Sequence, residues 1–541
     1  MFPITAGRPA TFAPKGMVAS PHSLASAAGV DALRAGGSAV DAAIATGAAL
    51  SVLYPHMTGV GGDAFWLIYD AEACRVRYLS GGGRSARSAS IDWFRSRGMH
   101  EIPLRGFLPA TLTVPGAVAS WCAAHEEYGR LPLSHDLAAA IEYAREGYPV
   151  TGRLARWIEM CAGENALNAH ALALFVPDGA APRAGDRLWN RGLARVLERI
   201  ASDGHEGFYS GDTARSLASF SRGGGGFFGE EDFSGQQASW GEPLRGTYRG
   251  VEIFETPPPT QGFTVLEMLN LVEPCEIGKL DPLGPELVHL LVQAKQIAYH
   301  DRDRLLADPE FHPVPVENLI SKAYASQRRP LMRAERALPW DLLPSYGTLA
   351  GDTVFVCAVD AEGNAAALIQ SLYFTFGSGV VAGDTGIVLQ NRSAYFSLDP
   401  LHPNRLEPGK RPIHTLIASI ALKDGRPWQV LGCMGADGQP QIHLQTYVGL
   451  VDFGFDIQQA LEMPRWLSGR FNIGDPRDLL NIEGRFPEAT VEKLERRGHG
   501  VNRWPDWCEL AGHAHGITID PQSGMRMGGA DPRSDGAAIG Y

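Results

Sequence analysis

The pattern of apolar and polar positions divides the chain into a helix-rich first part and a strand-rich second part. Residues 22–53 contain two Ala-rich apolar stretches, interrupted at Gly36 and Gly37, which predicts two closely packed helices. Residues 133–205 repeat apolar positions at helical spacing and are predicted to be largely helical. Beyond residue 352, Gly and Asp turns separate short β-branched segments: TVFVCAV, AALIQSLY, GIVLQ, IASIALK and WQVLGCM. These segments predict strands, so helices flanking packed sheets are the expected architecture.

Three turns and one linker connect these elements. A Gly-rich turn entering a strand is predicted for TGVGGDAFWLIYD (58–70), and a turn entering a helix for TPPPTQGFTVLEMLNLVE (256–273). A hairpin loop is predicted for DAEGN (360–364). Residues 327–352 carry prolines and charges without clear periodicity, which predicts an exposed linker that ends at Thr353.

Composition places the chain among ordinary globular proteins and narrows its partners. It has 541 residues, of which 45% are hydrophobic and 20% charged. Its formal net charge of −12 argues against nucleic acid or an anionic membrane as a partner, because both require basic surface. A small anionic substrate remains compatible, since a few local arginines are enough to bind one.

Targeting signals and cysteines point to the cytoplasm. The N-terminal segment lacks a basic region followed by an apolar one, so no signal peptide is expected. The apolar run AAIATGAALSVLYP is too short to span a bilayer. The seven cysteines are scattered and form no CxxC pair, which favours reduced thiols in a cytoplasmic protein.

The common catalytic motifs are missing from the sequence. It contains no GxxxxGK[ST] phosphate loop, no GxSxG nucleophile elbow and no HExxH metal motif. His513 and His515 form a histidine pair, but without further ligands at suitable spacing. We therefore expect neither a metal ion nor an organic cofactor.

The role of Thr353 has two possible interpretations. A threonine that opens a strand is usually structural, because threonine favours strands. If the chain were cut between Asp352 and Thr353, however, the threonine would gain a free α-amine with an ordinary pKa of about 8, which could accept the proton of its own hydroxyl. An ester formed by attack of the hydroxyl on the preceding carbonyl, followed by hydrolysis, would make this cut. Thr353 alone does not decide between the two readings.

Several motifs in order resemble the γ-glutamyltranspeptidase family of N-terminal-nucleophile hydrolases. The similar segments cover nearly the whole chain: AGGSAVDAAIATGAALSVLYPHMTGVGGDAFWLIYD (35–70), LTVPGAVASW (112–121), ETPPPTQGFTVLEMLNLVE (255–273), TVFVCAVDAEGNAAALIQSLYFTFGSGVVAGDTGIVLQN (353–391), GKRP (409–412) and ADPRSDGAAIGY (530–541). The order of these motifs is more specific than any one of them, and it favours the nucleophile reading of Thr353.

The resemblance implies a fold, a self-cleavage and a catalytic set. The implied fold is an α/β αββα sandwich, with a large piece, residues 1–352, and a small catalytic piece, residues 353–541. Thr353 falls on the catalytic threonine. Ser371 falls where the family places a threonine that supports the nucleophile. Gly435 and Ala436 fall on a Gly-Gly loop whose backbone N–H groups stabilise the oxyanion.

The residues that would bind a γ-glutamyl group differ from the family pattern. Tyr373 stands in place of an asparagine, and Arg392 in place of a glutamine or glutamate. Tyr395 replaces the acid that pairs the α-ammonium, and His414 with Thr415 replaces a Ser-Ser pair. The arginine that clamps the substrate carboxylate corresponds best to Arg84, with Arg87 nearby. Without the acid, a substrate ammonium would have no partner, whereas Arg84, Arg392 and His414 could bind a carboxylate. The alternative is that the arginines are solvated surface residues and that the histidine belongs to the core.

These departures favour an amidohydrolase for a small acidic amide. The motifs GDT, IQS, RPIHT and MGADGQPQ are similar to a family branch that includes oxamate amidohydrolase, so oxamate is the leading expected substrate. Three alternatives stay open: a γ-glutamyltransferase or glutathione hydrolase, a glutaryl-type acylase, and an unprocessed binding protein. The expected partners are a small amide substrate and the two fragments of the same chain, with a homodimer of processed heterodimers left open.

Overall fold

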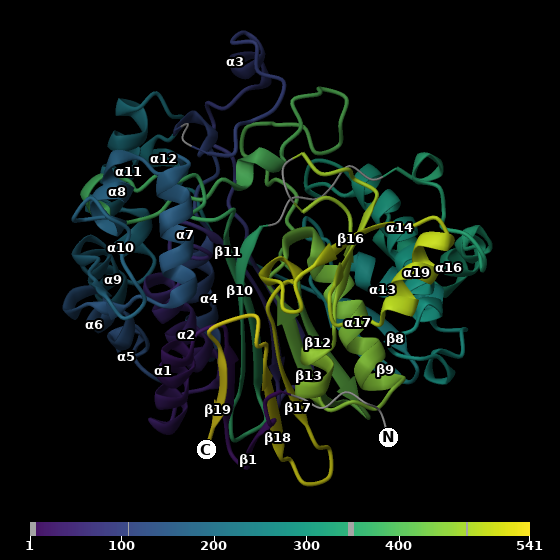
Figure 1. Ribbon diagram of the computed structural model, residues 1–541. Coiled ribbons are helices and arrows are strands. Elements are labelled where there is room, and N and C mark those ends of the chain that lie inside the picture. The colour runs from purple at the N-terminus through teal and green to yellow at the C-terminus, as the bar shows by residue number, and fades with distance from the viewer. Residues whose placement is uncertain (1–6, 106–107, 345–350, 472–473) are drawn as a thin grey trace.

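Two antiparallel seven-stranded sheets form the centre of the molecule (Figure 1). The computed structural model describes residues 7–105, 108–344, 351–471 and 474–541. The strand order of the first sheet is β19 (Ala537–Gly540), β2 (Met17–Ser20), β10 (Asp352–Val359), β11 (Ala365–Tyr373), β3 (Asp63–Asp70), β4 (Arg75–Gly81) and β7 (Ser239–Gly241). That of the second is β1 (Thr11–Ala13), β18 (Arg526–Ala530), β17 (Ala514–Ile519), β13 (Arg426–Cys433), β12 (Ala418–Lys423), β9 (Val251–Glu255) and β8 (Leu244–Tyr248).

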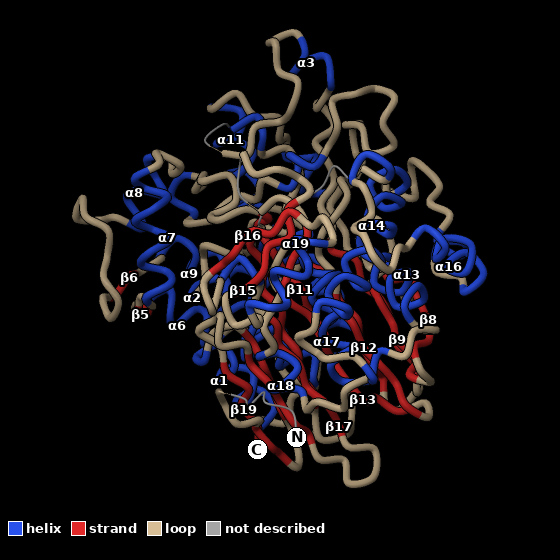
Figure 2. Tube along the Cα trace, turned by 45° about the vertical axis from the view of Figure 1, so that its right-hand side comes forward, coloured by secondary structure: helices blue, strands red, loops and turns tan. Residues whose placement is uncertain are grey.

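Helices cover the outer face of each sheet, so the predicted αββα sandwich is confirmed (Figure 2). The first sheet is covered chiefly by α1 (Ser23–Arg34), α2 (Ala39–Leu53) and α4 (Ala117–Tyr128), with α6 (Ala138–Glu146) and α9 (Arg191–Asp203) behind them. The second is covered by α13 (Phe263–Val272), α17 (Gln439–Val451) and α18 (Ile457–Glu462), with α14 (Pro285–Leu305) packed behind α13.

Side-chain alternation along the strands builds the layers. On β10, Val354 packs against the helices, whereas Phe355 packs between the sheets with residues such as Ile420 and Ile517. Helix α2 is buried along its whole length. It can lie this close to the first sheet because its residues are small: a Cβ on Gly47 would lie only 2.9 Å from the side chain of Leu368.

Both sides of residue 353 contribute strands to each sheet. In the first sheet, β10 lies between β2 and β11, and the C-terminal strand β19 pairs with β2. In the second, β9 pairs with β12. Pieces 1–352 and 353–541 would therefore remain paired through backbone hydrogen bonds after a cut. The division of the chain at this bond stays a prediction.

Most predicted elements are confirmed. Residues 22–53 form α1 and α2, β3 follows the Gly-rich turn, α13 follows the Pro-rich turn, and residues 360–364 connect β10 to β11. Residues 133–205 are mainly helical, interrupted by the short pair β5 (Tyr148–Pro149) and β6 (Arg187–Leu188). In the described ranges, every helix falls short of the length or apolar character needed to cross a bilayer.

Two predictions were wrong. GIVLQ (386–390) is not a strand but makes a single bridge, Val381 to Val388, because positive-φ glycines such as Gly383 and Gly386 bend the segment. The linker is not wholly exposed: Leu338 and Leu343 are buried in the core beside α14. Residues 345–350 of this linker lie outside the described residues.

Candidate active site

Thr353 lies near the start of β10, in the middle of the first sheet. Its side chain is buried, with 1% of the residue exposed. Because side chains alternate along a strand, Thr353 shares the inter-sheet side of β10 with Phe355. The ring of Phe355 occupies the space above Gly432, near the end of β13, where a Cβ would clash with it. The predicted nucleophile therefore lies at the end of the layer between the two sheets.

A β-bulge interrupts the pairing of β10 with β11 beside the predicted cleavage site. Asp352 pairs with Tyr373, whereas Val354 pairs with Gln370, so β11 contains one extra residue at this point. Tyr373 has a φ of 81°, a left-handed conformation that is uncommon for residues other than glycine. Bulges redirect side chains, and this one accompanies the turn of Ser371 toward the end of β10.

Ser371 hydrogen-bonds the carbonyl group of the predicted scissile bond. Its hydroxyl donates to the carbonyl oxygen of Asp352 at 2.6 Å. The same hydroxyl accepts from the backbone N–H of Tyr373 at 2.7 Å and from Nη2 of Arg392 at 3.2 Å. These two donors fix the hydroxyl so that its proton points at the carbonyl oxygen. The carboxyl group of Asp352 accepts from the hydroxyl of Thr375, and burial raises the pKa of Asp352 to about 6.

Gly435 and Ala436 form a tight turn next to the same bond. Their φ angles are 143° and 45°, so Ala436 adopts a left-handed conformation at a cost of roughly 1–2 kcal/mol. The side-chain amide of Gln261 donates to the carbonyl oxygen of Ala436 at 3.0 Å. A Cβ on Gly351 would lie 2.8 Å from the Cβ of Ala436. The predicted oxyanion turn therefore contacts the segment that precedes the scissile bond.

Arg392 is a buried cation beside Ser371. It is 0% exposed, so the alternative of a solvated surface arginine is wrong. Its Nη1 donates to the hydroxyl of Thr415 at 3.1 Å, and its guanidinium lies 4.6 Å from the ring centre of Tyr373 and 5.7 Å from that of Tyr395. Its Nε has no hydrogen-bond partner among the described residues.

Tyr395 is tied to a carboxylate that already has a cation. Its hydroxyl donates to Oδ2 of Asp437 at 3.2 Å. The carboxylate of Asp437 forms a buried ion pair with Arg302, which also donates to Oε1 of Gln261 at 2.7 Å. This carboxylate is therefore committed within the protein. The sequence analysis predicted no site role for Asp437 or Gln261, because in the sequence both look like ordinary turn residues.

His414 and Asp63 form a second buried pair next to Arg392. His414 Nε2 lies 3.6 Å from Oδ2 of Asp63, and both side chains are fully buried. Burial raises the pKa of Asp63 to about 6, and the nearby Arg392 guanidinium opposes this rise. Burial lowers the pKa of His414 well below its usual range, and Arg392 lowers it further. The sequence reading missed Asp63, although a carboxylate at the start of the apolar strand segment DAFWLIYD is the signal that could have revealed it.

Arg84 forms its ion pair away from Ser371, and Arg87 follows it three residues further along the chain. Nη2 of Arg84 donates to both carboxylate oxygens of Glu310 at 2.8 Å, and its Nη1 donates to the carbonyl of Gly409 at 3.0 Å. The backbone N–H of Arg87 donates to Asp232 at 2.9 Å. Among the described residues, no hydrogen bond or ion pair joins the side chain of either arginine to Ser371 or Arg392, and their role as substrate ligands stays a prediction.

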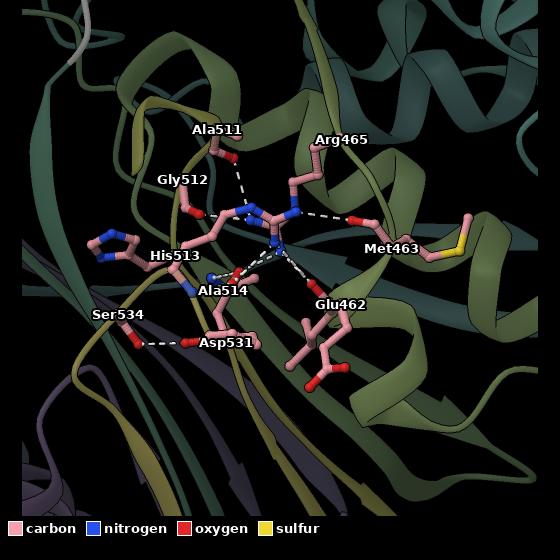
Figure 3. A network of polar contacts seen from close by, with 12 residues as sticks. Glu462, Met463, Arg465, Ala511, Gly512, His513, Ala514, Asp531 and Ser534 are labelled. Carbon is pink, nitrogen blue, oxygen red and sulfur yellow. Dashed lines mark hydrogen bonds and ion pairs between the residues drawn. The ribbon is translucent and has the colours of Figure 1, made fainter. Parts of the chain in front are cut away.

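A buried polar network lies behind the predicted oxyanion turn (Figure 3). Arg465 donates to the carbonyl of Gly512 at 2.7 Å and pairs with Asp531 at 2.5 Å. The next residue after Gly512, His513, accepts from the backbone N–H of Met434 at 2.8 Å. Met434 directly precedes Gly435. The network thus fixes the strand ends that carry the turn.

The histidine pair considered as a metal site is part of this buried region. His513 and His515 are fully buried, and within the described ranges neither belongs to a group of three side chains close enough to hold a metal ion. Such a group occurs elsewhere, at Asp41, His125 and Asp136. The two carboxyl groups of this cluster, Asp41 and Asp136, can also lie this close together without a metal ion if they share a proton.

The chain is similar over nearly its full length to proteins named as hydrolase and amidohydrolase proenzymes. The profile of the family described as Gamma-glutamyltranspeptidase matches residues 25–541. The "Glutathione hydrolase-like YwrD proenzyme" of Bacillus subtilis is 42% identical over 526 residues, covering 97% of this chain and 98% of that protein. The "Oxamate amidohydrolase proenzyme" of Klebsiella pneumoniae is 38% identical over 532 residues, again covering 97% and 98%.

A solved structure shares the fold. The cephalosporin acylase from Bacillus halodurans superimposes with a TM-score of 0.92 at 37% identity, covering 100% of this chain and 98% of that one. This agreement and the family match bear out the resemblance seen in the motifs. The chain therefore belongs to the gamma-glutamyltranspeptidase family, and it is an amidohydrolase with the αββα fold of the N-terminal-nucleophile hydrolases.

Proposed function

We propose that the chain cleaves itself between Asp352 and Thr353. The hydroxyl of Thr353 attacks the carbonyl carbon of Asp352, the peptide nitrogen leaves as the α-amine of Thr353, and water hydrolyses the resulting ester. The observation that carries the proposal is the 2.6 Å hydrogen bond from Ser371 to the carbonyl oxygen, where negative charge develops during attack. Relatives named as proenzymes lend further support.

The α-amine freed by this cut then serves as the base for amide hydrolysis. It accepts the proton of the Thr353 hydroxyl, directly or through a water molecule, and the oxygen attacks the substrate amide carbon. Backbone N–H groups at Gly435 and Ala436 stabilise the oxyanion. Ammonia or an amine leaves with a proton, and water hydrolyses the acyl-enzyme ester, which regenerates the threonine.

The substrate is a small acidic amide, with oxamate as the specific proposal. Arg392 is a buried cation beside Ser371, and its Nε is free of partners in the described part of the chain, so a substrate carboxylate can bind there. The α-ammonium of a γ-glutamyl substrate would meet this cation, while the carboxylate of Asp437 is already matched by Arg302. The 38% identical relative named for oxamate supports the same choice.

A substrate comparison tests the proposal. The processed protein is assayed for ammonia release from oxamate, for cleavage of a γ-glutamyl anilide and for hydrolysis of a glutaryl amide. We expect oxamate to have the highest kcat/KM. A preference for the anilide would favour a glutathione hydrolase. A preference for the glutaryl amide would favour an acylase, which is the second candidate because the chain superimposes so closely on a cephalosporin acylase.

A further inference from the structure

Unpartnered polar atoms gather next to Arg392. Oδ2 of Asp63, both ring nitrogens of His414 and Nε of Arg392 are buried and have no hydrogen-bond partner among the described residues. The other oxygen of Asp63 is fully used: it accepts from the backbone N–H groups of Gly83 at 2.9 Å and Gly116 at 3.0 Å, and from the Gln390 side chain at 3.0 Å. Only Oδ2 of this carboxyl group is therefore available to a ligand or a proton.

The position of Asp63 follows from strand pairing. It is opposite Ser371 in the register of β3 with β11, and Ser371 contacts Arg392. His414 is held from the other side, because its backbone N–H donates to the carbonyl of Pro259 at 2.8 Å. The carboxyl group, the imidazole and the guanidinium are consequently neighbours beside the predicted scissile bond.

The net charge of these three groups decides whether a carboxylate can bind beside Arg392. If Asp63 is ionised and His414 neutral, the charge of Asp63 cancels that of Arg392. A substrate carboxylate would then meet a like charge in a buried site, which strongly disfavours binding. One added proton leaves the positive charge of Arg392 available.

Other charged groups near Asp63 do not supply this positive charge. Arg411 pairs with Asp308 at 3.3 Å and with Glu310 at 2.5 Å. The hydroxyl of Tyr209 donates to the carbonyl of Pro115 at 2.8 Å. Among the described residues, the titratable and charged side chains that act on Asp63 or on His414 are these two residues themselves, Arg392, Arg411 and Tyr209.

We propose that Asp63 and His414 together take up one proton from solvent when a substrate carboxylate binds to Arg392, so that the binding of an acidic amide weakens as pH rises. This inference rests on the proposed function. The proton lies between Oδ2 of Asp63 and Nε2 of His414, and no other bond changes. Whether it is written as a neutral acid with a neutral imidazole or as a carboxylate with an imidazolium, the pair carries one more positive charge. Because burial raises the pKa of Asp63 only to about 6, the free site is mostly ionised at neutral pH and must acquire the proton on binding.

Calorimetry with oxalate tests the inference. Oxalate, the product of oxamate hydrolysis, is titrated into the processed protein at pH 7.5 in two buffers of different ionisation enthalpy. The matched variant is Asp63→Asn, which keeps an oxygen acceptor for Gly83, Gly116 and Gln390. We expect about one more proton taken up per site in the wild type than in the variant. Any uptake by the Thr353 amine is common to both proteins and cancels in the comparison.

The pH dependence gives a second readout. From pH 7 to pH 8, the Kd of the wild type for oxalate should rise by about tenfold more than the Kd of the variant. Equal proton uptake in both proteins, or no oxalate binding, would overturn the inference. If the variant fails to fold, buffer-independent binding heat in the wild type would overturn it. Oxamate turnover in the same preparation separates this failure from failure of the proposed function.

Discussion

Replacing Ser371 by alanine should leave the chain folded but nearly uncut. The substitution removes the hydroxyl that donates to the carbonyl oxygen of Asp352 at 2.6 Å. That oxygen becomes an oxyanion when Thr353 attacks, so the hydrogen bond is stronger in the transition state than in the resting chain. Loss of one such donor typically slows a reaction about 100- to 1,000-fold, or by about 2.7–4 kcal/mol.

The same substitution has a cost in stability that must be separated from the rate. Ser371 also accepts hydrogen bonds from the N–H of Tyr373 and from Arg392, and each buried donor left without a partner costs about 1–3 kcal/mol. Thermal unfolding of the uncut variant therefore accompanies the rate measurement. Ser371→Thr is the matched control, because it restores a hydroxyl on the same carbon.

The assay follows disappearance of the full-length chain on denaturing gels after purification, at one temperature for all variants. We expect the alanine variant to remain mostly whole over a period in which wild type and the threonine variant are converted to pieces 1–352 and 353–541. A folded alanine variant that is cut within about tenfold of the wild-type rate would refute the assigned role of Ser371 in self-cleavage.

Three further substitutions test the turn at Ala436, the buried carboxyl pair at Asp136 and the ion pair of Asp531. Gly351→Ala should slow self-cleavage at least about tenfold on the same gels, because its Cβ would lie 2.8 Å from that of Ala436. Asp136→Asn should raise the melting temperature at pH 8. Burial and then the Asp41 carboxylate raise the pKa of Asp136 to about 9, so the folded state loses stability as pH rises from about 4, where the unfolded chain ionises. Asp531→Asn should lower stability in urea by about 3–5 kcal/mol, because it leaves a buried arginine unpaired.

Each of these has an outcome that contradicts it. If the Gly351→Ala variant is cut at the wild-type rate, the turn at Ala436 can shift to accommodate the added Cβ. A lower melting temperature for the Asp136 variant at pH 8 would indicate that the two carboxyl groups stabilise the fold, through a shared proton or a bound cation. An unchanged urea midpoint for the Asp531 variant would show that the network in Figure 3 does not stabilise the folded state.

The sequence predicted best what depends on local pattern. The loop at residues 360–364 predicts a hairpin, and a hairpin necessarily brings Ser371 back beside the start of β10. The bulge that aims Ser371 at the Asp352 carbonyl could not be foreseen, because it depends on the left-handed backbone of Tyr373 rather than on residue type. The strand predicted at 386–390 failed for a similar reason, since positive-φ glycines outweighed its β-branched composition.

Contacts between distant segments were largely beyond sequence reasoning. Asp63 meets His414 only because β3 pairs with β11 and residue 414 is held by the turn at Pro259. Arg84 was chosen as a substrate ligand from motif position, yet Glu310, far along the chain, pairs with it. Arg392 shows the opposite outcome: its burial fits the role inferred from the motif, and only tertiary packing could reveal that burial.

We propose above all that Thr353 becomes an N-terminal nucleophile. The most direct test of this proposal is the intact mass of freshly purified protein. We expect two chains, of which the smaller begins at Thr353, and a single full-length chain for the Thr353→Ala variant. A wild-type chain that remains whole after prolonged incubation, while folded, would contradict the account, because Thr353 would then have no free amine to act as its base.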